Sequence, residues 1–221
     1  MTEGPVLYGV DESIYVRTVR IVLAEKSVPH HRVPVSLGES VLRLPEHLTR
    51  HPFGGVPVMD IDGLRLMETM AICRYIAETR SGPSLIPDNA EDRARMNMAI
   101  GLLDTYGAET LITAGLTHPD AGAAADPAGY QRALAEGGML LQCVMEARDG
   151  GAWLAGSHLS LADCLLAAVI SHVSPTPAYR KLLAVKGVSD WWAAVSARQS
   201  LRLTEPDREA LPHGDGIAEA G

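Results

Sequence analysis

Alanine is distributed very unevenly along this 221-residue chain, and this limits the folds that it can adopt. Residues 1–89 contain three alanines, whereas residues 90–221 contain 26. Because alanine is the strongest helix former and is depleted in strands, we expect a mixed first part and an all-helical second part. A stretch rich in turn residues, 81–90, separates the two. The predicted organisation has four parts: a first domain (1–82), a linker (83–90), a helical domain (91–204) and an acidic, mobile tail (205–221).

The composition narrows the class of protein. With 47% hydrophobic residues, the chain is too apolar for an intrinsically disordered protein. The formal net charge of −8 argues against nucleic-acid binding, and half of it lies in the tail. The sequence shows neither a signal peptide nor the roughly 18 uninterrupted apolar residues of a membrane span. We therefore expect a cytoplasmic protein with no nucleic-acid or membrane partner.

Three cysteines, Cys73, Cys143 and Cys164, lie far apart within apolar helical patterns. Free cysteine is a common core residue, so we expect three buried free thiols. There is neither a CxxC pair nor a Cys/His cluster with zinc spacing, and no metal site is predicted.

The first domain shows the order β-α-β, a loop region, and then β-β-α. Its predicted elements are strand 5–10, helix 14–27, strand 30–35, strands 56–61 and 64–67, and helix 68–80. Ser13 directly precedes the first helix and is a natural N-cap. The Asp62-Gly63 pair lies between two apolar runs, which predicts a tight hairpin turn.

The second domain is predicted to contain five helices: 90–115, 128–148, 161–173, 178–185 and 188–197. Asp88 is positioned to cap the first of them. The Gly137-Gly138 pair in the second permits a bend or a close approach of another helix. Ser160 and Asp163 have the spacing of a capping box, in which each side chain accepts a hydrogen bond from the other residue's amide.

Three segments in this order resemble the cytosolic glutathione transferase family. They are Leu7-Tyr8-Gly9 with Ser13 and Val19-Arg20, then His51-Pro52-Phe53-Gly54-Gly55-Val56-Pro57-Val58 with Glu68-Thr69-Met70-Ala71-Ile72, and finally Trp153-Leu154-Ala155-Gly156 with Leu159-Ser160-Leu161-Ala162-Asp163. The resemblance covers about residues 5–200 and is nearest to the serine-type phi group and related bacterial groups. It implies an α/β thioredoxin-like N-terminal domain, an all-α C-terminal helical domain, a homodimer, and glutathione as co-substrate or cofactor.

Glutathione chemistry needs a thiolate, but a free thiol has a pKa near 8.5 and is mostly protonated at neutral pH. A hydroxyl donor, backbone amides or the positive end of a helix can stabilise the sulfur anion. The resemblance assigns this hydroxyl to Ser13, as a donor and not as a covalent nucleophile. A purely structural N-cap is the alternative, and Tyr8 and Tyr15 are rival hydroxyls. Tyr15 occupies a position where some relatives carry Cys.

The resemblance also assigns contacts to the glutathione backbone. Val56-Pro57 resembles the family's cis-proline turn, which exposes the Val56 N–H and C=O to the cysteinyl part of the peptide. Glu68 is expected to take the γ-glutamyl amine. Thr69 opens a helix, where the amides attract anions, and is expected to take the γ-glutamyl carboxylate.

The glycyl carboxylate needs a cation, and Arg43 aligns roughly with a family Lys. Leu42 and Gly55 stand where relatives often carry two further contacts. Those contacts are missing here, which weakens glutathione binding or shifts the work to Arg43 and His51.

The second substrate is expected between Glu12, Tyr15 and the first helix of the helical domain, where Met96 and Ile100 are candidates. Apolar residues at helical spacing also fit a core. The main prediction is a homodimeric glutathione transferase that attacks an electrophilic small molecule, as in detoxification. Two alternatives stay open: a glutathione-dependent isomerase or reductive lyase of a biosynthetic or degradative pathway, and a non-catalytic glutathione-transferase-like interaction module.

Overall fold

The computed structural model of the chain describes residues 4–117, 119, 125–148 and 150–206. The first domain is built on a four-stranded sheet with the order β2-β1-β3-β4. Its strands are β1 (Val6–Tyr8), β2 (His31–Val33), β3 (Val58–Ile61) and β4 (Leu64–Met67). Strand β1 runs parallel to β2 and antiparallel to β3. The predicted hairpin is confirmed, because β3 and β4 pair antiparallel around Asp62-Gly63, both with positive φ.

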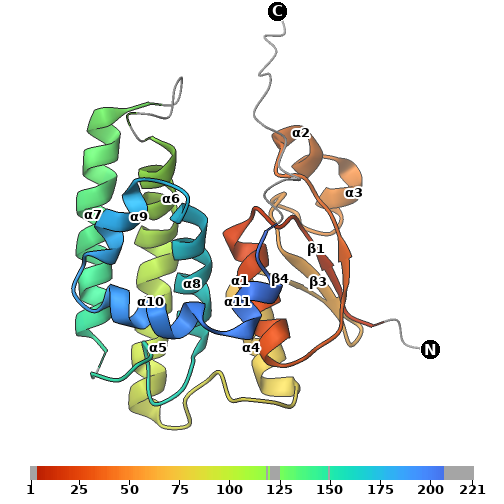
Figure 1. The fold of residues 1–221 in the computed structure, drawn as a ribbon. Coiled ribbons are helices and arrows are strands. Elements are labelled where there is room, and N and C mark those ends of the chain that lie inside the picture. Colours follow the sequence, from red (N-terminus) through yellow and green to blue (C-terminus); the bar gives the residue numbers. More distant parts are fainter. Residues whose placement is uncertain (1–3, 118, 120–124, 149, 207–221) are drawn as a thin grey trace, which may run out of the picture.

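Two helices cover the face of the sheet that is turned toward the second domain (Figure 1). They are α1 (Ile14–Glu25) and α4 (Thr69–Thr79), and each agrees with its predicted helix to within two residues. Helix α1 is buried along most of its length, because it packs on α4 and also on α8 (Leu161–Val173) of the second domain. The start of α1 is thereby held close to the junction of the domains.

The predicted loop region between β2 and β3 contains two helices of one turn each, α2 (Glu39–Leu42) and α3 (Pro45–Leu48). Four residues are too few to show an apolar period in the sequence. Only His47 of α3 is buried, so these helices depend little on hydrophobic packing. Both lead into the loop that carries the predicted cis-proline.

The second domain is helical, as predicted (Figure 1). Its other elements are α5 (Ala90–Leu102), the π-helical η1 (Leu103–Gly107), α6 (Ala108–Leu116), α7 (Pro127–Glu146), α9 (Ala178–Leu183), α10 (Val188–Ser196) and α11 (Gln199–Leu203). The first three form a continuous rod in place of the single predicted helix. The predicted cap was wrong by one residue. Asn89, which directly precedes the helix, accepts from the Asp92 amide at 2.8 Å, and Asp88 does not cap it.

Glycines let α7 lie close to this rod. A Cβ on Gly137 would lie 2.7 Å from Cδ2 of Leu111, and a Cβ on Gly107 would overlap Leu140. A Cβ on Gly138 would meet no atom within 4 Å. The close approach expected of the Gly137-Gly138 pair is therefore a property of Gly137.

The last helix, α11, was missed because its five residues carry no readable period, and it returns to α1. Arg198 and Ser200 donate to the Glu25 carboxylate at 2.6 and 2.5 Å. Arg17 donates to the Leu201 carbonyl at 3.3 Å. These hydrogen bonds hold the end of the described chain against α1 of the first domain.

Two of the three cysteines are buried. Cys73 and Cys164 are buried and free, as predicted, but Cys143 is exposed, because the buried stripe of α7 passes through Leu141 and Val144.

Among the described residues, no three His, Cys, Asp or Glu side chains gather into a group that could hold a metal ion. No described helix is both long and apolar enough to cross a membrane. The predicted tail lies outside the described residues from position 207 onward.

Candidate functional site

A cleft of about 470 Å³ opens where the loop before β3 meets the starts of α1 and α4 and the segment η1. The residues that line it are Tyr15, His51, Phe53, Gly55, Val56, Pro57, Glu68, Thr69, Met70, Ala71, Arg74 and Asp104. The fold thus brings the predicted contacts Val56, Pro57, Glu68 and Thr69, which come from two separate segments, into one wall.

The backbone of Val56 is available at this wall. The Val56–Pro57 peptide bond is cis, as predicted. Strand β3 begins only at Val58, and among the described residues no hydrogen bond engages the amide or carbonyl of Val56. An extended ligand can therefore pair with both groups, as an added strand would.

The start of α4 has one group that attracts anions and one group that attracts cations. Thr69 is its first residue, and within the described chain neither its hydroxyl nor its amide has a hydrogen-bond partner. Such unpaired amides at a helix N-terminus attract anions. Glu68 beside it has φ 67, a costly left-handed conformation for a residue other than glycine, and its carboxylate is exposed. The two positions together fit an amino-acid head group, which carries both a carboxylate and an ammonium.

Two histidines shape the loop in front of Val56. Nε2 of the buried His47 lies 3.0 Å from the Gly55 carbonyl oxygen, and Nδ1 of His51 accepts from the Phe53 amide at 3.3 Å. Because Nδ1 is an acceptor, the neutral His51 ring carries its proton on Nε2 and is a donor there. A Cβ on Gly55 would lie 2.8 Å from this Nε2. His51 therefore occupies the space that a larger residue at position 55 would need.

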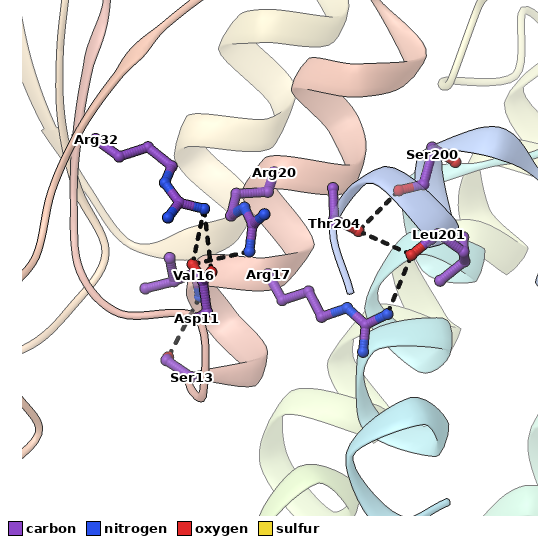
Figure 2. Close-up of polar contacts among 9 residues, drawn as sticks. All are labelled: Asp11, Ser13, Val16, Arg17, Arg20, Arg32, Ser200, Leu201 and Thr204. Atoms are coloured by element: carbon purple, nitrogen blue, oxygen red, sulfur yellow. Dashed lines mark hydrogen bonds and ion pairs between the residues drawn. The ribbon is translucent and has the colours of Figure 1, made fainter. Parts of the chain in front are cut away.

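Ser13 caps α1, as predicted. Its Oγ accepts from the Val16 amide at 3.3 Å (Figure 2). The loop before it is held by Asp11, which pairs with Arg20 at 2.8 Å and with Arg32 at 3.0 Å (Figure 2). Ser13 is buried and is not one of the residues that line the cleft. A role at the glutathione sulfur stays a prediction.

The two rival tyrosines are placed differently. The Tyr8 hydroxyl donates to Asp60 at 3.1 Å, outside the cleft, and burial together with this bond raises the pKa of Tyr8. Tyr15 lines the cleft, and no group of the described chain forms a hydrogen bond with its hydroxyl. Burial, followed by the negative charges of Asp104, Glu109 and Glu68, raises the pKa of Tyr15. Its hydroxyl is thus protonated at neutral pH and can donate.

The structure does not bring together the four residues that were predicted to line a second-substrate pocket. A hollow of about 330 Å³ lies between the start of α1 and the ends of α6 and α8, and Glu12 lines it. Tyr15 lines the first cleft, and its role toward a second substrate stays a prediction. The prediction for Met96 and Ile100 was wrong. They are 1% and 5% exposed within the hydrophobic core, because the apolar stripe of α5 faces the interior of the helical domain.

Arg43 is exposed at the end of α2 and does not line the cleft. Its Nη1 would lie 3.6 Å from a Cβ on Gly54, so the guanidinium stays beside the loop that borders the cleft. Its role as the cation for a carboxylate stays a prediction.

Sequence reasoning missed two charged residues of the cleft, Arg74 and Asp104. Nη2 of Arg74 on α4 donates to Oδ1 of Asn97 on α5 at 2.7 Å, which joins the two domains. Asn97 and Asp104 are seven residues apart, about two helical turns, and this spacing places them on one side of the rod. The sequence carries no signal for either residue, because α4 and the rod come together only in the folded protein.

The fold and the cleft define a class: a thioredoxin-like domain that can hold an extended peptide, followed by a helical domain. Residues 7–84 match the family model described as glutathione S-transferase, N-terminal domain, and residues 109–199 match that of the C-terminal domain.

Individual relatives support the same class. The chain is 35% identical over 173 residues to the maleylacetoacetate isomerase of Rhizobium meliloti, across 75% of this chain and 80% of that protein. It is 30% identical over 203 residues to glutathione S-transferase 1 of Zea mays, across 89% and 93%. The solved structure of glutathione S-transferase I from maize, in complex with an atrazine glutathione conjugate, has a TM-score of 0.80 at 27% identity and covers 91% of this chain and 96% of that one. The chain therefore belongs to the glutathione S-transferase family.

Proposed function

We propose that this protein is a glutathione transferase, which binds glutathione in the cleft and directs its thiolate at an electrophilic small molecule. The observation that carries the proposal is the combination, in one cleft, of the unpaired Val56 backbone, the N-terminus of α4 and the Glu68 carboxylate. Glutathione has the complementary groups: a peptide backbone and an amino-acid head. The conjugate held by the maize relative supports the same assignment.

The cleft orients the tripeptide. The γ-glutamyl head lies at the start of α4, where its ammonium pairs with Glu68 and its carboxylate takes the amide and hydroxyl of Thr69. The cysteinyl residue pairs with Val56, which directs its sulfur toward the N-terminus of α1. The positive end of that helix favours the thiolate over the thiol.

The glycyl carboxylate then lies on the side of the loop 51–55. His51 lines the cleft there and offers Nε2–H as a donor, whereas Arg43 lies outside the lining and supplies a more distant positive charge. This division of roles accounts for the family contact that is lost at Gly55, because His51 fills its place.

The electrophile occupies the hollow beside the start of α1. Its walls are largely apolar and include Ile14, Ile112 and Leu116, with Glu12 as a carboxylate in the lining. Asp11 is also present, but two guanidinium groups neutralise it. Such walls favour an apolar electrophile. The thiolate sulfur forms the new bond to its carbon, and the leaving group departs with its electron pair.

Calorimetric titration with glutathione tests the proposal. We expect saturable binding with one site per chain. Cysteinylglycine, which lacks the γ-glutamyl head, should bind far more weakly, because it cannot use Glu68 and Thr69. Absence of glutathione binding would refute the enzyme and leave a non-catalytic interaction module.

Glutathione-dependent isomerisation is the second candidate, favoured by the 35% identity to a maleylacetoacetate isomerase. The two reactions differ in whether they consume glutathione. Conjugation consumes one glutathione for each electrophile, whereas isomerisation returns it unchanged. Assays of free thiol during turnover of 1-chloro-2,4-dinitrobenzene and of maleylacetoacetate distinguish them. Thiol loss with the first substrate supports the transferase.

A homodimer is part of the proposal. Phe53, which lines the cleft, is 83% exposed. A groove of about 730 Å³ between the rod and α7 carries Tyr106 and Met139, which are 66% and 65% exposed. Exposed apolar residues that gather in one groove are typical of an interface between copies. Sedimentation should show a dimer that Phe53→Ser weakens. A cytoplasmic location also belongs to the proposal, supported by three free cysteines.

A further inference from the structure

We propose that Asp11 is a positioning residue for the reaction, which anchors the turn between β1 and α1 and thereby holds the Ser13 hydroxyl where the glutathione sulfur needs it. This inference rests on the proposed function and on the predicted role of Ser13, because it requires glutathione in the cleft. Asp11 acts through the backbone of the turn and donates nothing to a reacting atom.

The chain reverses sharply between β1 and α1. Gly9 leaves the strand with φ 146, and a Cβ on it would overlap Val16. The Gly9 amide donates to the Val33 carbonyl of β2 at 3.0 Å. The Ser13 amide then donates to the Val10 carbonyl at 3.3 Å, which closes a tight turn over residues 10–13. Backbone hydrogen bonds thus fix the two ends of the turn, and its middle depends on side chains.

Asp11 supplies the side-chain anchor in the middle of this turn. Its Oδ1 lies 2.8 Å from Nη1 of Arg20 on α1 and 3.0 Å from Nη1 of Arg32 on β2 (Figure 2). The other middle residue is Glu12, whose side chain forms no hydrogen bond or ion pair within the described chain. The Asp11 carboxylate therefore ties the turn to the helix and to the strand that flank it.

The partner on α1 makes this anchor specific. The Arg20 side chain is only 8% exposed, and a buried guanidinium is costly without an opposite charge beside it. Burial lowers the pKa of Arg20, and the charge of Asp11 opposes this shift. Arg20 follows Ser13 by seven residues, about two helical turns, so both lie on one side of the helix. Asp11 thus folds back along the side of α1 that begins at Ser13.

The position of Ser13 tolerates little displacement. Its Oγ accepts from the Val16 amide at 3.3 Å, so its own proton stays available for a second partner. The residue is 7% exposed, and only a small part of it can meet a ligand. A shift of the turn by about 1 Å would bury or misdirect the hydroxyl, and errors of this size cost up to about 100-fold in rate. Asp11 and Glu12 also line the hollow assigned to the electrophile, so the same turn borders both substrates.

The charges of this cluster distinguish positioning from simple electrostatics. One carboxylate faces two guanidinium groups, which leaves an excess of positive charge beside the start of α1. Removing the carboxylate increases that excess, and nearby positive charge favours a thiolate. Charge alone would therefore lower the pKa of the bound thiol. Loss of the Ser13 donor would raise it, so the two roles predict opposite signs.

Alanine replacement of Asp11 tests the proposal. Asp60→Ala is the matched control, because Asp60 is also a half-buried carboxylate of the first domain. It is held by Arg65 at 2.7 Å and by Tyr8 at 3.1 Å, and it lines neither the cleft nor the hollow. Asp11→Asn serves if the alanine variant does not fold, because it removes the same charge.

Four measurements are made on each folded variant. Calorimetry gives the Kd of glutathione, and the ultraviolet absorbance of bound thiolate against pH gives the thiol pKa. Steady-state assays with 1-chloro-2,4-dinitrobenzene give kcat/KM, and urea unfolding gives the stability.

In Asp11→Ala we expect the thiol pKa to rise by about 1, the value of one hydrogen bond to a charged group. The kcat/KM for the electrophile should fall about 10- to 100-fold at neutral pH. The Kd of glutathione should change less than about threefold, because Val56, Glu68 and Thr69 hold the peptide from other elements. Asp60→Ala should lose comparable stability and keep the thiol pKa within about 0.3 of the wild type.

A lower thiol pKa in Asp11→Ala would overturn the proposal, because the carboxylate would then act through its charge alone. An unchanged thiol pKa, or an equal rise in Asp60→Ala, would also overturn it, because Asp11 would then serve only stability. If wild-type protein binds no glutathione at all, the proposed function itself fails, and calorimetry shows this before any variant is made.

Discussion

Replacing Asp163 with alanine should be among the most damaging single changes in this protein. The carboxylate is fully buried at the start of α8, and it accepts four hydrogen bonds. Its donors are the Leu154 amide at 2.9 Å, the Ser160 amide at 2.8 Å, the Ser160 hydroxyl at 2.7 Å and Nε1 of Trp191 at 2.8 Å. One side chain thus ties together the 150s loop, the start of α8 and α10.

The magnitude follows from counting the donors that lose their partner. In Asp163→Ala the Ser160 hydroxyl can turn to other acceptors, but three buried N–H groups cannot. Each unsatisfied buried donor costs about 1–3 kcal/mol, so the gross cost is roughly 3–9 kcal/mol. Removing a buried charge returns part of this, and burial already raises the pKa of Asp163 against the hydrogen bonds that oppose the shift. We expect a net loss of about 4 kcal/mol, a large part of a typical total stability of about 5–15 kcal/mol.

Urea unfolding, followed by tryptophan fluorescence, measures this loss. Asp163→Asn serves if the alanine variant does not fold. It keeps one acceptor oxygen and should cost about 2 kcal/mol. Asp190→Asn is the matched control, because Asp190 is exposed in the first turn of α10 and should cost less than about 1 kcal/mol. A loss in Asp163→Asn no larger than in the control would refute the role assigned to the hydrogen-bond network.

Substitutions at Gly137, Glu25 and Thr69, with controls, test other parts of the structure. Gly137→Ala should destabilise by about 1–3 kcal/mol, because its Cβ would overlap a buried leucine, whereas Gly138→Ala, in open space, should stabilise by about 0.5–1 kcal/mol. Burial raises the pKa of Glu25, but the hydrogen bonds from Arg198 and Ser200 and the charge of Arg198 outweigh it, so the pKa lies below its usual 4.5. The ionised carboxylate therefore stabilises the fold above pH 4.5, and this stabilisation is lost as the pH falls through the lowered pKa. Glu25→Gln should remove this acid sensitivity in urea titrations at successive pH values. Thr69→Val should weaken glutathione binding by calorimetry about tenfold, while Thr69→Ser should retain it.

Much of the architecture was predictable because local rules decide it. The alanine distribution and the apolar periods predict the mixed sheet and the helical second domain, and both are present. The Asp62-Gly63 hairpin, the Ser13 cap and the capping box at Ser160 and Asp163 depend on contacts within a few residues, so short patterns were sufficient. Shorter elements such as α2, α3 and α11 escaped prediction, because one helical turn shows no period.

Part of the candidate site was predicted from the sequence, and part depends on the tertiary structure. Val56, Pro57, Glu68 and Thr69 were predicted from the family resemblance, and their roles at glutathione stay predictions, although all four line the cleft. Their meeting in one cleft, together with Tyr15 and Asp104 from other elements, depends on how α1, α4 and η1 pack across the domain junction.

Packing also decided which apolar side chains became core. Met96 and Ile100 have the spacing of either a pocket wall or a core stripe, and the sequence cannot distinguish the two. The chain's own sequence thus sets the secondary structure, the caps and the turns, because these depend on neighbouring residues. The position of Tyr15 in the cleft and the burial of Ser13 at the start of α1 depend on contacts between segments far apart in the chain. Those contacts exist only in the folded protein.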